Sequence, residues 1–134
     1  MMVLAWSSVA SAQVQTRVRI IEASNRGSVV DPVLRDVHGQ LGSLFSFTSY
    51  RLLRDVNLRL AGARPVEVPV HRGRSMEITL VGDYKNLVEL RIRIKRDGAA
   101  ILNTHVRLNP GRTILIGGPK HGDGTLIFAI TARP

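Results

Sequence analysis

The sequence predicts an all-β (β-rich) fold: an antiparallel β-sandwich or small barrel of about seven to nine strands, with one short helix near residues 31–42. Along most of the chain apolar and polar side chains alternate with a period of two, which is typical of half-buried strands. Turn-forming residues separate these segments, as in Asp97-Gly98 and Asn109-Pro110-Gly111. Short strands separated by such turns indicate antiparallel neighbours.

The first twelve residues are expected to be a signal peptide. They form an uncharged, mainly apolar run ending in Ala10-Ser11-Ala12, the small-x-small pattern that a signal peptidase accepts. The run is short and lacks a preceding positive charge, which favours a start upstream of Met1; the alternative is an apolar N-terminal strand. We expect cleavage after Ala12, which N-terminal sequencing of the exported protein checks. Recovery of an uncleaved cytoplasmic chain would contradict this expectation.

The first strand is predicted at residues 14–22, and the helix follows it. Arg17 and Arg19 alternate with apolar residues and are expected to face water. Asp31 and Pro32 are suited to the N-cap and first position of the helix. One helical face then carries Val33, Leu34, Val37 and Leu41, and the helix is expected to end near Gly42.

The remaining strands are predicted at residues 44–50, 52–60, 66–70, 75–80, 88–95, 102–108, 113–116 and 125–131. Pro69 places the strand at 66–70 at a sheet edge or a bulge. In 88–95 every even position is aliphatic and every odd position is charged, so Leu90, Ile92 and Ile94 should face the core. The strand at 125–131 is apolar on both faces, which predicts a central or covered position.

Composition limits the possible functions. Residues 13–134 are expected to form one domain, since about 100–150 residues is the usual domain size. The chain has 19 Lys+Arg and 10 Asp+Glu, which gives a net charge of +9. It has no cysteine, and this excludes thiolate nucleophiles, Cys-ligated zinc and covalent haem attachment. Aromatic residues make up only 4%, which argues against specific nucleic acid as a partner through base stacking. Beyond the N-terminal segment no apolar run reaches the roughly 20 residues of a membrane span.

Eight basic residues are candidates for contacts with an anionic polymer or lipid. If those other than Lys120 lie on outward faces of neighbouring strands, they would form a cationic plate whose guanidinium groups pair with carboxylate or phosphate. The alternative is that they are solvated and paired with the acidic residues. The eight are Arg17, Arg19, Arg59, Arg91, Arg93, Lys95, Arg107 and Lys120.

No catalytic residue, cofactor or metal site is predicted. The four histidines do not stand at metal-ligand spacing, and no G-x-S-x-G motif is present. The glycine-rich stretch 117–124 lacks the P-loop spacing and is expected to be a flexible hairpin loop.

Residues 110–118 and 126–134 resemble the end of the bacterial outer-membrane secretin domain. In that family a strand ending in Gly-Gly is followed by an aliphatic strand with a Thr-Pro-like tail, and here Gly117-Gly118 and Thr131-Ala132-Arg133-Pro134 take those places. The chain lacks the family's length, and its earlier strands do not match the family's gate. The resemblance implies a periplasmic, assembly-associated β domain and no pore function.

The sequence therefore favours a non-enzymatic exported protein, periplasmic or secreted, that acts as an interaction or assembly module of the cell envelope. Its partner would be another envelope protein or a second copy of itself. One alternative is a binder of anionic polymer or lipid through its arginine faces, and another is an enzyme with a dispersed active site. A contiguous basic surface would favour the polymer, whereas scattered charges with an open strand edge would favour a protein partner.

Overall fold

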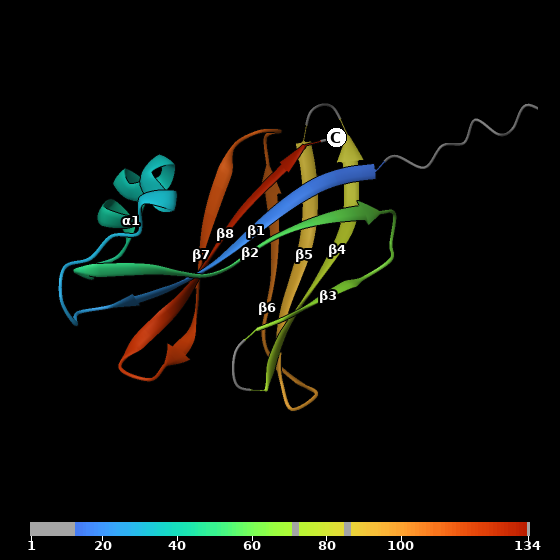
Figure 1. Ribbon diagram of the computed structural model, residues 1–134. Helices are drawn as coiled ribbons and strands as arrows, with labels where there is room; N and C mark the ends of the chain where they lie inside the picture. The colour runs from blue at the N-terminus through green and yellow to red at the C-terminus, as the bar shows by residue number, and fades with distance from the viewer. Residues whose placement is uncertain (1–12, 71–72, 85–86, 134) are drawn as a thin grey trace, which may run out of the picture.

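Eight strands form two antiparallel sheets in the computed structural model, which describes residues 13–70, 73–84 and 87–133 (Figure 1). Sheet A has the order β2-β1-β8-β7, with β1 Gln13–Ser24, β2 Ser49–Ala61, β7 Thr113–His121 and β8 Gly124–Arg133. Sheet B has the order β3-β4-β5-β6, with β3 Val66–Pro69, β4 Arg74–Tyr84, β5 Leu87–Arg96 and β6 Ala99–Leu108. The predicted sandwich is confirmed, and the described strands form no closed barrel. The predicted signal peptide, residues 1–12, lies outside the described residues.

The main core lies between the sheets, whose strands run steeply across one another in Figure 1. The strands supply alternate side chains to it over most of their length, as the alternation predicts. On β5 the side chains of Leu90, Ile92 and Ile94 are fully buried, which confirms the predicted register. β3 is an edge strand, as Pro69 predicts, and β8 is central in sheet A.

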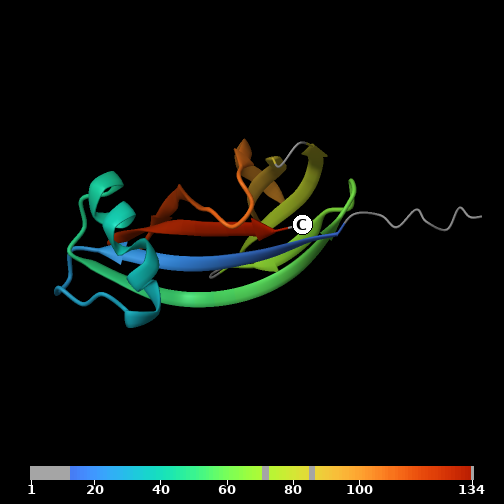
Figure 2. The ribbon, with the colours of Figure 1, turned by 90° about the horizontal axis from the view of Figure 1, so that it is seen from above.

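A second core lies on the opposite, outer face of sheet A. The 3-10 helix η2 (Pro32–Val37) and the helix α1 (His38–Leu44) cover one end of that face (Figure 2). Their buried residues pack on alternate side chains of β1 and β8, so these strands are apolar on both faces. The helix-side residues are Leu34, Val37 and Leu41, and the sheet residues include Ile21, Ile127 and Ala129. Among the described residues, no helix is long and apolar enough to span a membrane.

The predicted helix begins where expected but is not a regular α-helix. The Asp31 side chain accepts a hydrogen bond from the Val33 N–H, and Pro32 follows at the first position. Six residues then adopt 3-10 geometry, with about three residues per turn. This narrower turn places Val33 outside the apolar face, where it is 40% exposed. The α-helix continues to Leu44, two residues beyond the predicted end.

The predicted strand at 44–50 is wrong. Residues 45–48 form no strand, and β2 begins at Ser49. The apolar side chains of Phe45 and Phe47 pack against the second core instead, where both are half-buried. The Phe47 ring lies edge-on to the ring of Tyr50. The Tyr50 hydroxyl donates to the backbone oxygen of Phe45 at 3.1 Å, which holds this irregular segment against the sheet.

β2 is also longer than the predicted strand at 52–60, and it changes face partway. Leu53 is an extra residue in its ladder with β1, since Arg54 pairs with Ile20 and Leu52 pairs with Ile21. The bulge therefore changes the face on which the even-numbered residues lie. Before it Leu52 packs under the helices, and after it Val56, Leu58 and Leu60 pack in the main core. Val81 and Ile101 are the extra residues of similar bulges in β4 and β6, and both are exposed.

Tight turns join the strands as the sequence predicts, with one correction. Asp97 and Gly98 both have positive φ, as a type I′ hairpin requires. At Gly111 φ is +83° and the Arg112 N–H donates to the Asn109 oxygen, so the type II turn is confirmed. The predicted flexible loop at 117–124 is wrong, because β7 and β8 pair up to His121 and Gly124 and leave a two-residue turn.

Candidate functional site

The seven residues of the predicted plate do not share one face. Arg17, Arg19 and Arg59 lie on the outer face of sheet A, whereas Arg91, Arg93, Lys95 and Arg107 lie on the outer face of sheet B. The main core separates the sheets, so the two faces point in opposite directions. Lys120 is exposed on β7, close to the hairpin end. The expectation of one cationic plate is therefore wrong.

On sheet B, acidic residues alternate with the basic ones. Glu77 on β4 accepts hydrogen bonds from Lys95 at 3.0 Å and Arg93 at 3.4 Å, and these cations hold its pKa below the usual range. Glu89 lies 3.8 Å from Arg107. Arg91 is exposed and has no carboxylate partner among the described residues. Apart from Arg91, the candidate basic residues of this face therefore lie beside carboxylates.

Arg19 is buried, which corrects the expectation that it faces water. Its side chain is 1% exposed because η2 crosses above it. Both terminal nitrogens donate to the Asp36 carboxylate, at 2.8 and 2.9 Å. This bidentate pair attaches η2 to the sheet, since each bond is charge-assisted. A period-two pattern could not reveal it, because the covering segment comes from elsewhere in the chain.

Arg17 forms a second bidentate pair one step along the same face. Its Nε and Nη2 donate to the two oxygens of Asp55 on the neighbouring strand, at 2.9 and 2.6 Å. The Arg17 guanidinium lowers the pKa of Asp55, as Arg19 lowers the pKa of Asp36. Both carboxylates therefore have an arginine partner, and the Arg17–Asp55 and Arg19–Asp36 pairs lie next to each other beside η2.

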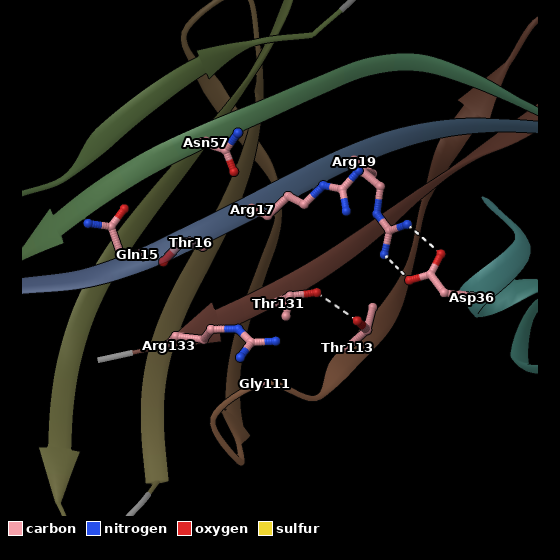
Figure 3. Close-up of a pocket in the computed structure, with 10 residues that line it drawn as sticks. All are labelled: Gln15, Thr16, Arg17, Arg19, Asp36, Asn57, Gly111, Thr113, Thr131 and Arg133. Atoms are coloured by element: carbon pink, nitrogen blue, oxygen red, sulfur yellow. Dashed lines mark hydrogen bonds and ion pairs between the residues drawn. The ribbon is translucent and has the colours of Figure 1, made fainter. Parts of the chain in front are cut away.

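A depression of about 320 Å³ lies on this face, beyond the helices (Figure 3). Across it the pairing places Asn57, Arg17, Thr131 and Thr113 in one row over the four strands. The Thr113 and Thr131 hydroxyl oxygens are 2.6 Å apart. Arg133 also lines the depression and is exposed, and Gly111 lies at its rim. The lining residues are Gln15, Thr16, Arg17, Arg19, Asp36, Asn57, Gly111, Thr113, Thr131 and Arg133.

Sequence reasoning found only Arg17 and Arg19 of this depression. Arg133 could have been found, since it alternates with Ala132 and so shares the Thr131 face of the last strand. Thr113 and Asn57 could not have been predicted from the sequence, because they lie near Arg17 only through the strand order β2-β1-β8-β7. Of the other candidates only Arg59 is nearby, opposite Gln15 on β2.

No cluster of metal-ligating side chains occurs in residues 13–70, 73–84 and 87–133. His38, His105 and His121 lie on different elements, and His71 is outside the described residues. His121 is 8% exposed, with its Nε2 3.4 Å from Glu22, and Arg51 approaches the same carboxylate at 3.9 Å. These side chains lie together near the β7–β8 hairpin, on the face of sheet A opposite the helices.

Asp36→Asn is expected to lower the free energy of unfolding by about 1–2 kcal/mol at pH 7. Bonds to a charged group contribute about 1.5–3 kcal/mol, and the Asp36 side chain is 56% exposed, so screening reduces this value. The folded-state pKa of Asp36 is lowered, so its contribution is present above the unfolded pKa, about 3.9, and is lost as pH falls through the folded pKa.

Urea melts of both proteins between pH 7 and pH 2 measure this difference. It should shrink below about pH 4, where the unfolded carboxyl of the parent takes up its proton. Asp97→Asn, which removes an exposed carboxylate from a turn outside the ion pairs of the described residues, is the matched control. A difference for Asp36→Asn that stays constant down to pH 2 would contradict the expectation.

Comparisons with known proteins support the fold and assign no family. No family model matches the chain, and no curated protein matches it. Among solved structures it is similar to the T2SS secretin XcpQ from Pseudomonas aeruginosa, with a TM-score of 0.52 and 12% sequence identity. The match covers 93% of this chain and 59% of the secretin chain. This similarity of fold to a T2SS secretin supports the coarser part of the likeness predicted from residues 110–118 and 126–134, a secretin-like domain.

Proposed function

We propose that this protein is an exported, non-enzymatic assembly module of the cell envelope that pairs with an envelope protein, or with itself, through the free edge of β6. The similarity of fold to a T2SS secretin supports a role in an envelope assembly. The predicted signal peptide at residues 1–12 supports export. The observation that carries the proposal is the difference between β6 and the other three sheet edges.

Three of the four edge strands have features that oppose pairing. β3 has only four residues and includes Pro69. β2 carries several charged residues, including Arg51, Arg54 and Arg59. β7 is approached by α1, because Gln40 donates to the Thr113 oxygen at 3.5 Å, and Pro119 interrupts its far end. Charge, proline, shortness and cover are the usual means of protecting an edge from other strands.

β6 has less such protection, although the bulge at Ile101 interrupts its regular pairing. It is ten residues long, contains no proline, and carries Arg107 as its single Lys, Arg, Asp or Glu. Its inward residues Leu102, Thr104 and Val106 are only half-buried, whereas their β5 partners are fully buried. The main core is therefore incompletely covered along this edge. An added strand would satisfy the backbone groups of β6 and complete the burial of these side chains.

The two alternative functions have less support. Binding of a polymer or lipid by one arginine-rich plate is disfavoured, since the candidate residues are divided between opposite faces. For an enzyme with a dispersed active site, the hydrogen bonds of the described residues include no nucleophile–base pair, and ion pairs lower the pKa of Asp36, Asp55 and Glu77. An assembly role needs only a surface that another chain can recognise.

A photo-crosslinking side chain at Asn103 on β6 should give a discrete crosslinked product in the cells that produce the protein. The same group at Arg91 on the internal strand β5 is the reference position and should give little product.

Ile101→Lys should reduce the Asn103 product about fivefold or more, because a lysine on an edge disfavours strand addition. Val81→Lys makes a similar change at an exposed bulge of an internal strand and should leave the product unchanged. Equal products from Asn103 and Arg91, or loss with both lysine variants, would contradict the proposal.

A further inference from the structure

We propose that the depression on the outer face of sheet A binds one oxyanion, a carboxylate or a phosphate group, with Arg133 as its principal ligand. This site lies on sheet A, whereas the β6 edge belongs to sheet B. The inference therefore goes beyond the proposed assembly role and does not depend on it.

The charge of the depression favours an anion. Three arginines and one carboxylate line it. Asp36 is engaged by Arg19, and Arg17 is engaged by Asp55 from outside the lining. Arg133 is exposed and has no carboxylate partner among the described residues. Of the three lining arginines, Arg133 is therefore the one whose guanidinium is available to a ligand. Arg17 and Arg19 are held in their ion pairs with Asp55 and Asp36.

The position of Arg133 is defined by the turn beneath it. A Cβ built on Gly111 would lie 3.5 Å from the Arg133 Cζ, so the guanidinium packs against the bare glycine backbone. Gly111 has a φ of +83°, a conformation that other residues rarely adopt. The turn that ends β6 and begins β7 therefore supplies both the bend and the space in which the Arg133 side chain lies.

The uncharged lining residues can donate hydrogen bonds. Thr113 and Thr131 share one hydrogen bond, and since two hydroxyls carry two protons, one O–H remains free to donate. The Arg19 Nε is buried and has no hydrogen-bond partner among the described residues. A buried donor without an acceptor is unfavourable, so an anion that reached it would bind more tightly. Gln15 and Asn57 add amide donors at the other side of the depression.

These features are specific for an oxyanion rather than for a cation or an apolar ligand. The single lining carboxylate is occupied, so a metal ion would meet arginines without free acidic ligands. A guanidinium offers parallel N–H groups that match two oxygens of one carboxylate or phosphate. On the outer face of sheet B, by contrast, Glu77 and Glu89 lie among the basic residues.

Binding is tested by titrating the full ¹⁵N-labelled chain with inorganic phosphate and, separately, with acetate at constant ionic strength. We expect saturable shifts confined to the Arg133 side-chain N–H and to the backbone amides of Gly111, Thr113 and Thr131. Arg133→Gln should weaken binding about tenfold or more. Arg91→Gln is the matched control, because Arg91 is also exposed and without a carboxylate partner among the described residues, but lies on sheet B. Its affinity should stay within about twofold of the parent.

A response to phosphate alone, or to acetate alone, supports the site and identifies the group. Thr131→Val, which replaces the hydroxyl by a methyl group, should also weaken the binding and shows whether the threonine pair takes part. The proposal is overturned if neither anion gives saturable shifts, or if Arg133→Gln and Arg91→Gln weaken binding equally. Unchanged spectra away from the depression establish that each variant is folded.

Discussion

Ile92→Ala is expected to lower the free energy of unfolding by about 2–5 kcal/mol, the range observed when a large aliphatic side chain is removed from a core. Ile92 is fully buried at the middle of β5, paired with Ile78 on β4 and Thr104 on β6. Strands on both sides fix the backbone there, so the core cannot easily collapse into the cavity. Urea melts monitored by circular dichroism measure the change.

Arg91→Ala is the control for this prediction, because Arg91 precedes Ile92 and is exposed on the opposite face. Its effect should lie within about 0.5 kcal/mol. Arg93→Ala is expected to cost up to about 1 kcal/mol, because Arg93, unlike Arg91, bonds to Glu77. If Arg91→Ala were more destabilising than Ile92→Ala, β5 would have to be shifted by one residue, which exchanges its two faces.

Gly124→Ala is expected to destabilise the fold by about 3 kcal/mol, the upper part of the usual range for overpacking. Gly124 begins β8 beside the end of β1, and a Cβ there would overlap the backbone oxygen of Ala23. A backbone atom cannot rotate away as a side chain can, so the end of sheet A must shift. Thermal or urea unfolding of the variant measures the loss.

Gly62→Ala provides the comparison for this substitution. A Cβ on Gly62 would meet no atom within 4 Å, and its φ is not in the positive range. Reduced freedom of the unfolded chain should leave this variant unchanged or more stable by about 0.4–1 kcal/mol. Equal destabilisation by both variants would show that the close approach of Ala23 to Gly124 is not the cause.

The elements that sequence reasoning predicted well are those that local patterns determine. β5 alternates without exception, and the Asp97-Gly98 turn needs only two residues with positive φ. Asp31 and Pro32 likewise begin the helix through contacts within a few residues. The fold class followed from such local signals repeated along the chain.

The errors occur where a distant segment determines the environment of a residue. Phe45 and Phe47 suggested a strand, but they fill a core formed with the helices. Arg19 was placed in water because the sequence does not show that η2 returns across β1. The pattern of residues 52–60 gives no sign of the bulge at Leu53, where one extra residue reverses the faces of β2. The depression was missed for the same reason, since its residues come from four strands and a turn.

The reversal of faces at Leu53 has a consequence for how the molecule unfolds. Because of it β2 contributes to the helix-covered core before the bulge and to the core between the sheets after it, as β1 and β8 do with their two faces. The helices therefore have no separate set of strands on which they could persist alone. Local opening that detaches β2 from β1 must weaken both cores together, so the protection of both against hydrogen exchange should be lost in one cooperative step.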